Sequence, residues 1–147
     1  MTMNDRRKSP GAGVVVLQNK RGKPHVLGLL FKGKYDFPKG KKEDSESDLD
    51  CARRECWEEA SISRFTLLPV DPIILEDRLT LFLATTSQDA HIMPNPSTGY
   101  VEHEEVRWFP LDGTFNDFKE YLQVACQWAR DCIQLFDLDD MIEDENR

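Results

Sequence analysis

Three glutamates, Glu55, Glu58 and Glu59, stand close together near the middle of the chain. On a helix, their spacing of i, i+3 and i+4 places the three carboxylates on one face. Clustered like charges destabilise a helix unless water solvates them or a cation neutralises them, and the sequence alone leaves both explanations open. Carboxylate oxygens are the ligands that hard divalent cations such as Mg²⁺ prefer, often together with substrate phosphates. The cluster therefore indicates a candidate site for metal-dependent chemistry on phosphates.

Five lysines precede this acidic cluster along the chain: Lys32, Lys34, Lys39, Lys41 and Lys42. Residues 1–42 hold 11 Lys and Arg against 2 acids, a charge of +9, whereas residues 43–147 hold 8 against 25, a charge of −17, which together give −8. Such an acidic protein is not expected to bind nucleic acid broadly, because duplex affinity rests mostly on phosphate neutralisation. The basic segment can instead face the phosphates of a small substrate, and Lys39, Lys41 and Lys42 are the candidate contacts. Solvated loop lysines would show the same pattern.

Residues 40–62 resemble the signature of the Nudix hydrolase family, G-x5-E-x7-R-E-U-x-E-E-x-G-U, in which U is a bulky aliphatic residue. The chain agrees with the signature at Gly40, Glu46, Arg54, Glu55, Glu58, Glu59 and Ile62. It departs at Cys56, which packs as a small hydrophobe, and at Ser61, which replaces a glycine that commonly ends the helix. Both departures leave the carboxylates intact. The chain is therefore identified as a member of this family.

The resemblance implies a metal centre built on the same glutamates. Glu58 and Glu59 are expected to be the principal ligands of Mg²⁺ or Mn²⁺, and Glu55 a further ligand or the group that deprotonates water. The backbone carbonyl of Lys39 or Gly40 is expected to complete the ligand set. A divalent cation at such a site neutralises phosphate charge and lowers the pKa of a water molecule. Hydrolysis of a phosphoanhydride bond is therefore the expected activity.

In this family a further acid comes from a loop after the signature and precedes a tryptophan. Glu102 stands six residues before Trp108, so we expect it to be a distal metal ligand or the general base. Alternatives in the same loop are His103, Glu104 and Glu105, and a solvated acidic loop would also fit. Arg54 and Glu46 are expected to form a structural ion pair between the helix and the loop before it.

The resemblance also implies a class of substrate. Residues 37–41, Phe-Pro-Lys-Gly-Lys, are similar to a segment of dinucleoside polyphosphate hydrolases, of diphosphoinositol polyphosphate hydrolases and of mRNA decapping enzymes. The stretch from Glu102 to Trp108 is similar to the H-E-H-Q…R-W segment of diadenosine tetraphosphate hydrolases, although Val101 and Glu104 replace the expected His and Gln. A small-molecule nucleotide, and first of all a dinucleoside polyphosphate, is the expected substrate. The alternatives are, in order, an mRNA cap with RNA as the partner, a diphosphoinositol polyphosphate, and a nucleotide-binding module without turnover.

Aromatic side chains near these segments are candidates for stacking on a nucleobase: Tyr35, Phe37, Tyr100 and Trp108. Packing in the core explains each of them equally well, and Tyr100 is retained as the substrate-binding candidate. An RNA substrate would also need an extended basic surface for its backbone, whereas the excess of basic residues is confined to residues 1–42.

Local patterns predict the elements that position these residues. Strands are expected over residues 13–18, 25–31, 64–70, 73–76, 79–86 and 106–109, with the first two joined as a hairpin. Helices are expected over residues 47–60, with Ser45 or Ser47 as the N-cap, and over residues 115–136, where apolar residues recur every three or four positions. Together with the resemblance, these elements predict an α/β protein with the Nudix fold, an α/β/α sandwich with a mixed β-sheet between helices.

The chain of 147 residues has the length of a single domain. We expect a flexible N-terminal arm over residues 1–10, one Nudix hydrolase domain over residues 11–136 and a frayed acidic tail over residues 137–147. The longest apolar runs are too short to span a bilayer, so no membrane association is expected. Four cysteines without a metal-ligand spacing predict reduced thiols and a cytoplasmic location. The sequence leaves the oligomeric state open.

Overall fold

A computed structural model describes residues 10–146 of the chain, so most of the expected N-terminal arm lies outside the described residues. The strands are β1 (Gly11–Lys20), β2 (Lys23–Phe31), β3 (Lys34–Asp36), β4 (Lys39–Lys41), β5 (Thr66–Leu67), β6 (Ile73–Leu75), β7 (Leu79–Thr85) and β8 (Val106–Pro110). The helices are α2 (Asp48–Ala60), α3 (Glu120–Leu135) and a 3₁₀ turn (Asp139–Met141).

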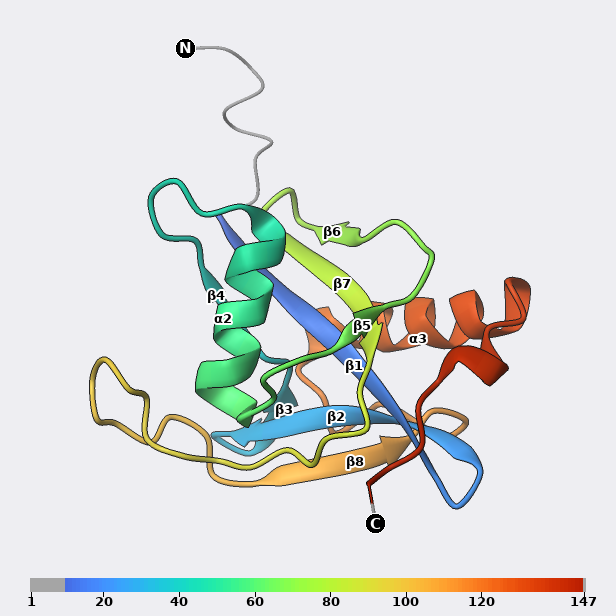
Figure 1. Cartoon of the computed structure of the whole chain (residues 1–147). Helices are drawn as coiled ribbons and strands as arrows, with labels where there is room; N and C mark the ends of the chain where they lie inside the picture. Colours follow the sequence, from blue (N-terminus) through green and yellow to red (C-terminus); the bar gives the residue numbers. More distant parts are fainter. Residues whose placement is uncertain (1–9, 147) are drawn as a thin grey trace, which may run out of the picture.

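All eight strands form one mixed sheet in which β1 is central (Figure 1). On one edge β1 pairs in parallel with β7. Its other edge has two antiparallel partners, β4 near the start of the strand and β2 near its end. The outer strands extend this core, because β3 and β8 pair with β2 while β5 and β6 pair with β7. The predicted hairpin and the predicted mixed sheet are both confirmed.

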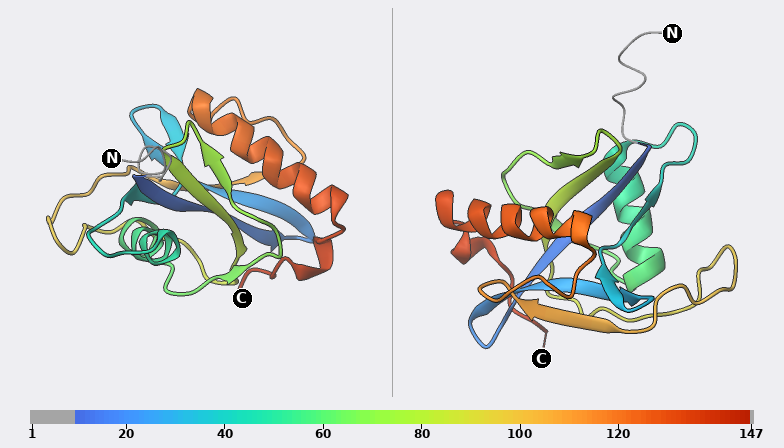
Figure 2. Two further views of the ribbon diagram at one scale, coloured as in Figure 1. Left: turned by 90° about the horizontal axis from the view of Figure 1, so that it is seen from above. Right: turned by 180° about the vertical axis from the view of Figure 1, so that it is seen from behind.

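The two helices cover opposite faces of the sheet, as the view from above shows (Figure 2). Side chains of β1 alternate between them, with Val14 and Val16 packed in the core cluster under α2. Val15 and Leu17 belong to the core cluster under α3. A strand buried on both faces reads as a continuous apolar run, which explains the sequence GVVVLQ. The predicted three-layer α/β/α arrangement is confirmed.

The capping residues of α2 set both of its ends. The hydroxyl of Ser47 accepts a hydrogen bond from the backbone N–H of Asp50 at 3.0 Å, as an N-cap residue does. At the other end Ser61 has φ 61°, and its N–H donates to the carbonyl of Trp57 at 3.0 Å. Ser61 thus adopts the left-handed conformation of the missing glycine, at a cost of about 1 kcal/mol. The predicted bounds of this helix are correct to within one residue.

Helix α3 begins at Glu120, so the prediction that it starts at Phe115 is wrong. Phe115 and Phe118 are buried and continue the apolar spacing, but they lie in a turn in which the Phe118 N–H donates to the Phe115 carbonyl. This turn lies against β3, where Tyr35 and Phe118 form a bridge. Side-chain spacing alone did not distinguish that turn from a first helical turn.

Two predicted segments at the edges of the fold also differ from the structure. The strand expected over residues 64–70 is confined to β5, a two-residue strand. The prediction of a frayed tail is wrong for residues 137–146, because Leu138 and Ile142 are buried. Asn19 fixes this segment, since its N–H donates to the Glu143 carbonyl at 2.8 Å and its carbonyl accepts from the Glu145 N–H at 3.0 Å. The acidic tail therefore pairs with the end of β1 and also contacts the end of β7.

Replacing Phe118 by alanine should destabilise the protein by about 3–5 kcal/mol. The Phe118 ring is fully buried. Its centroid lies 4.9 Å from the ring centroid of Phe109 and 5.3 Å from that of Phe37. Urea unfolding at neutral pH measures the loss. Phe136→Ala is the matched control, because that ring is 60% exposed and its loss should cost less than about 1 kcal/mol. Equal losses in the two variants would contradict this description of the core.

The described residues contain no helix that is long and apolar enough to cross a membrane. The four cysteines are all buried and free, as the sequence predicts. Burial raises the pKa of Cys51 to about 11 and that of Cys126 to about 12, so these thiols are protonated and unreactive near neutral pH.

Candidate active site

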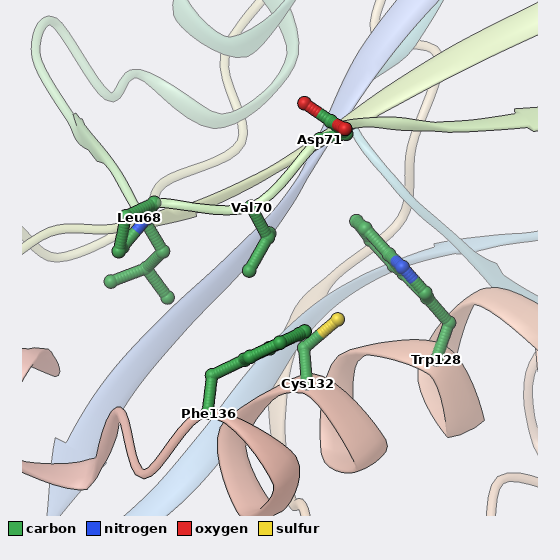
Figure 3. A pocket seen from close by; sticks show the side chains of 7 residues that line it. Leu68, Val70, Asp71, Trp128, Cys132 and Phe136 are labelled. Atoms are coloured by element: carbon green, nitrogen blue, oxygen red, sulfur yellow. The ribbon is translucent and has the colours of Figure 1, made fainter.

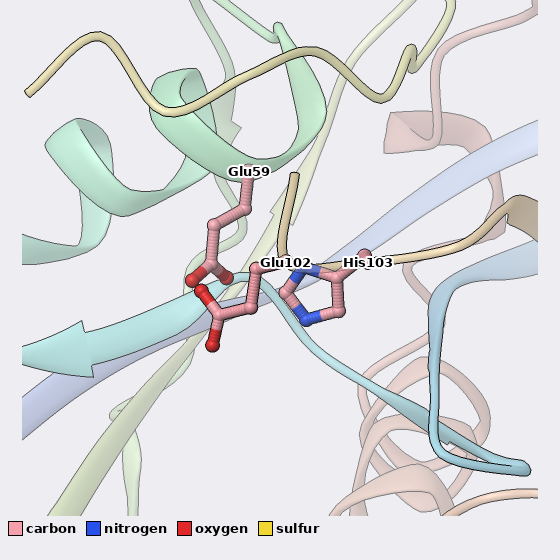
Figure 4. Close-up of side chains that lie close together, drawn as sticks. All are labelled: Glu59, Glu102 and His103. Carbon is pink, nitrogen blue, oxygen red and sulfur yellow. The ribbon is translucent and has the colours of Figure 1, made fainter. Parts of the chain in front are cut away.

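The acidic residues of the signature and of the β7–β8 loop meet at one side of α2. Glu59 points from the last turn of α2 towards Glu102, and His103 follows Glu102 in the loop (Figure 4). One ligand atom from each of the three lies within 4.8 Å of the others. A cavity of about 320 Å³ adjoins this group, lined by Lys39, Gly40, Glu43, Arg54, Glu55, Glu58, Glu59, Asn95, Ser97, Thr98 and Glu102. The fold thus brings Glu102 to the three glutamates of the signature.

The other acids of the β7–β8 loop are directed elsewhere. Glu104 accepts a hydrogen bond from the backbone N–H of Lys32 at 3.3 Å. Glu105 accepts one from the phenol of Tyr35. His103 is only 4% exposed, and burial lowers its pKa, so its ring is neutral and can offer a nitrogen to a cation. Among the alternatives, the geometry favours Glu102, with His103 beside it.

Glu55 lies against the loop that leads into α2. Its carboxylate is so close to Gly40 that a Cβ atom on residue 40 would overlap it. This contact explains why the signature has glycine at that position. Burial raises the pKa of Glu55 to about 7, although the neighbouring Arg54 acts in the opposite direction.

Glu59 is held between the sheet and the loop. The backbone N–H of Lys39 donates to its Oε1 at 3.1 Å. Burial raises the pKa of Glu59 to about 9, and the carboxylates of Glu55 and Glu102 add to the shift. Without a cation, the protein environment therefore disfavours the charged form. Glu55 is buried, Glu59 is partly buried and Glu102 is exposed. Such a group of oxygen donors that repel one another fits a hard divalent cation such as Mg²⁺ or Mn²⁺.

Arg54 is the cation that organises the signature. Its guanidinium contacts both carboxylate oxygens of Glu46, at 2.8 and 3.0 Å, and donates to the carbonyl of Lys41 at 2.9 Å. The hydrogen bond to Arg54 lowers the pKa of Glu46 to about 2. Arg54 also lies 3.3 Å from both Glu55 and Glu58. It therefore forms the expected ion pair and, in addition, fixes two of the candidate ligands.

The candidate lysines do not all face the carboxylates. Lys39 forms an ion pair with Asp36 at 3.2 Å, and Lys42 forms one with Asp48 at 3.1 Å. Side chains alternate across a strand, so Lys39 and Lys41 lie on the opposite face of β4 from the position of Gly40. Lys41 is exposed there.

These two lysines line a second cavity, of about 340 Å³, on that other face of β4. Its full lining is Pro10, Gly11, Lys39, Gly40, Lys41, Leu75, Glu76, Arg78, Leu79 and Tyr121. Lys39 and Gly40 line both this cavity and the cavity with the carboxylates. Arg78 comes from the β6–β7 turn and Tyr121 from α3. No local pattern in the sequence links these two residues to the signature.

The aromatic candidates have different environments. Tyr35 and Phe37 are buried in the core, and the ring of Trp108 lies under the ammonium of Lys20 at 5.0 Å. Tyr100 is 77% exposed and lines a small cavity together with Glu102. Trp108 is partly buried, so Tyr100 is the most exposed ring of the four.

A cavity of about 550 Å³ is larger than either of these, but it lies on the α3 face (Figure 3). It is lined by Leu68, Pro69, Val70, Asp71, Trp128, Cys132 and Phe136. Asp71 is the one carboxylate in this lining, so the cavity does not provide the oxygen donors that a hard divalent cation needs. Cavity size alone therefore does not identify the catalytic site.

Comparison with known proteins shows the family of the chain. The sequence model of the NUDIX domain matches residues 5–126. The chain belongs to the Nudix hydrolase family. A stretch of 79 residues, 53% of the chain, is 40% identical to a protein described as an uncharacterized 17.7 kDa protein of Enterobacteria phage T4. The match spans about half of that relative, 47% of its length.

Solved Nudix structures share the fold. An Ap4A hydrolase of C. elegans, in a binary complex, superposes with a TM-score of 0.64 at 19% identity, over 86% of this chain and 97% of the other. The Nudix hydrolase RenU of M. smegmatis gives 0.63 at 16% identity, over 96% and 92%. At such low identity these likenesses show the Nudix fold, with its mixed sheet and two helices, and leave the substrate open.

The raised pKa values of Glu55 and Glu59 predict how the stability of the protein depends on pH when no divalent cation is present. Above the ordinary glutamate pKa of about 4.5, the unfolded chain releases protons that Glu55 and Glu59 keep in the folded protein. The folded state then binds more protons than the unfolded state, so stability falls as pH rises. In EDTA, the melting temperature should therefore fall between about pH 5 and pH 9.

Differential scanning calorimetry in EDTA and in Mg²⁺ measures this effect. Mg²⁺ should raise the melting temperature most at the alkaline end, because it binds the ionised carboxylates. The Glu59→Gln variant should show a flatter pH profile in EDTA. Equal slopes in EDTA for the wild type and this variant would contradict the assigned burial of Glu59.

Proposed function

We propose that this Nudix pyrophosphohydrolase cleaves a phosphoanhydride bond of a dinucleoside polyphosphate, with diadenosine tetraphosphate as the representative substrate. The observation that carries the proposal is the pair of cavities that meet at Lys39 and Gly40. One contains the carboxylates, and the lining of the other has three basic residues against one acid, Glu76. A long polyphosphate chain needs charge neutralisation at the cleaved bond and further cationic contacts beside it. The likeness in fold to an Ap4A hydrolase supports the same substrate class.

Glu55, Glu58, Glu59 and Glu102 would hold Mg²⁺ or Mn²⁺. When bound, the cation supplies neutralisation of phosphate charge and a more acidic water. Either Glu55 or Glu102 accepts the proton of the attacking water at a carboxylate oxygen. A pKa of about 7 for Glu55 suits a group that exchanges a proton near neutral pH. Arg54 keeps the Glu55 and Glu58 carboxylates in place.

The second cavity binds the part of the substrate beyond the cleaved bond. Lys41 and Arg78 contact non-bridging phosphate oxygens, and Tyr121 lies beside them in the lining. Tyr100, on the acidic side, stacks on a nucleobase. A cytoplasmic location also belongs to the proposal and is supported by the four free cysteines.

Product analysis tests this proposal. The protein is incubated with Mg²⁺ and, separately, diadenosine tetraphosphate, capped RNA, a diphosphoinositol phosphate and an oxidised nucleoside triphosphate, with Glu58→Gln as the control. ATP and AMP released from diadenosine tetraphosphate are the expected products. Preferred release of 7-methylguanosine diphosphate from capped RNA would overturn the substrate in favour of decapping. If no compound is hydrolysed with Mg²⁺ or Mn²⁺, the chain is a nucleotide-binding module instead.

A further inference from the structure

The β7–β8 loop contains a closed turn built on Asn95. The Asn95 side-chain carbonyl accepts hydrogen bonds from the backbone N–H groups of Ser97 at 2.8 Å and Thr98 at 3.3 Å. The backbone N–H of Asn95 donates to the Tyr100 carbonyl at 2.8 Å, and the backbone carbonyl of Asn95 accepts from the Gly99 N–H at 2.8 Å. Gly99 has φ 76°, the left-handed conformation that glycine adopts without strain. One side chain thus organises the turn that presents Tyr100.

The other end of the same side chain contacts the catalytic helix. Asn95 Nδ2 donates to Glu58 Oε1 at 3.4 Å. Arg54 Nη1 lies 3.3 Å from the same oxygen. Asn95 is partly buried, whereas its neighbours on both sides, Pro94 and Pro96, are exposed. The Asn95 amide therefore points into the site rather than into solvent.

This contact lies between two fixed ends of the loop. Near its start, the His91 N–H donates to the Ala60 carbonyl at 2.9 Å. Near its end, the Glu104 N–H donates to the Leu30 carbonyl at 2.8 Å. Between these two anchors, one hydrogen bond joins the loop to α2 among the polar contacts of residues 10–146. It is the bond from Asn95 to Glu58. Ile92 adds apolar packing against the core under α2, and the buried His103 fixes the loop beside Glu102. Asn95 is therefore the polar contact that ties the middle of the loop to the carboxylates of α2.

We infer that Asn95 is a positioning residue that holds the middle of the β7–β8 loop, with Tyr100, against α2 and orients the Glu58 carboxylate for the cation. The inference rests on the proposed function, because it takes Glu58 as a metal ligand. Groups that hydrogen-bond to a ligating carboxylate orient it, and their loss typically weakens metal binding or activity by 10- to 100-fold. The Asn95 side chain also stabilises the turn that precedes Tyr100. It therefore couples metal binding to the position of Tyr100, the proposed contact with the substrate.

Two substitutions separate the two ends of the side chain. Asn95→Ser keeps a hydroxyl that can accept from the Ser97 N–H, but it is too short to reach Glu58. Asn95→Ala removes both the acceptor of the turn and the contact with Glu58, without adding a charge to the site. Asn116→Ser is the matched control, because Asn116 is exposed and lies outside the site.

Mn²⁺ binding is measured by calorimetry without substrate, together with amide hydrogen exchange and turnover. In both Asn95 variants the Kd for Mn²⁺ should rise about tenfold, and kcat should fall about tenfold. Amides of residues 95–102 should exchange faster only in the variants of Asn95. An unchanged Kd for Mn²⁺ and unchanged loop exchange in both variants would overturn the inference.

The Glu58→Gln variant keeps this test separate from that of the proposed function. If Glu58→Gln weakens Mn²⁺ binding while Asn95→Ser and Asn95→Ala do not, only the role of Asn95 is refuted. If Glu58→Gln leaves Mn²⁺ binding unchanged, the proposed metal site itself is refuted, and the inference with it.

Discussion

Replacing Glu59 by glutamine should lower kcat by about 10³-fold, which corresponds to about 4 kcal/mol of transition-state stabilisation. Glu59 contributes a carboxylate oxygen to the group formed with Glu102 and His103. Glutamine keeps the size of the side chain but removes the negative charge that a divalent cation needs. Turnover of diadenosine tetraphosphate in Mg²⁺ measures the effect.

The same substitution should leave the fold intact. Burial already disfavours the ionised form of Glu59, so a neutral amide at this position should not lower the melting temperature in EDTA. Glu104→Gln is the matched control, because Glu104 accepts a hydrogen bond from Lys32 and lies outside the group. Near wild-type activity in Glu59→Gln with a normal melting curve, or an equal loss in Glu104→Gln, would contradict the site.

Replacing Arg54 by alanine should destabilise the protein by about 2–3 kcal/mol, between the values typical of exposed and of fully buried ion pairs. The Arg54 side chain is 23% exposed and contacts Glu46, Glu55 and Glu58. Without the guanidinium, these carboxylates lose their nearby cation and repel one another. Urea unfolding and turnover in Mg²⁺ should therefore show lower stability and lower activity together.

The pH dependence of this loss identifies its cause. Arg54 lowers the pKa of Glu46 to about 2, so the stabilisation is present above the ordinary glutamate pKa and is lost as pH falls towards 2. The difference in unfolding free energy between wild type and Arg54→Ala should therefore be smaller at pH 3 than at pH 7. Arg54→Lys should recover only part of it, since an ammonium group cannot contact both oxygens of Glu46 in the same way. A difference that is equal at both pH values would contradict an ion-pair origin.

Local patterns in the sequence predicted the central part of the fold. The apolar run of β1, the hairpin with β2 and the helix around Glu55 depend on neighbouring residues, so their bounds were found within a few positions. Ser47 as the N-cap is also a local signal, because the capping hydrogen bond joins residues three apart.

Elements that depend on distant contacts were missed or misjudged. β4 is a three-residue strand stabilised by pairing with the distant start of β1, which a sequence window around β4 does not contain. β3 pairs with the nearby end of β2, but three residues are too few to show an alternating pattern. Phe118 keeps a helical spacing because its side chain is buried, although the backbone around it is a turn. The order of the acidic tail was also missed, because the tail is held by Asn19, which lies far away in the sequence.

Some residues of the candidate site could be predicted from local spacing, and others could not. The glutamates on α2 follow from one periodic segment, and the sequence therefore placed them together. The orientation of Lys39 and Lys41 depends on which face of β4 Gly40 occupies, which a sequence pattern does not contain. Asn95 and Arg78 reach the two cavities from separate loops, so only the folded chain reveals them.

The measurement that tests the central claim most directly is anomalous diffraction from crystals of the protein soaked in Mn²⁺. The metal site described above predicts an anomalous peak bounded by the carboxylates of Glu55, Glu58 and Glu59, with Glu102 on the loop side, and no such peak in Glu59→Gln. A peak elsewhere on the molecule, or none among these carboxylates at Mn²⁺ concentrations that support hydrolysis, would contradict it.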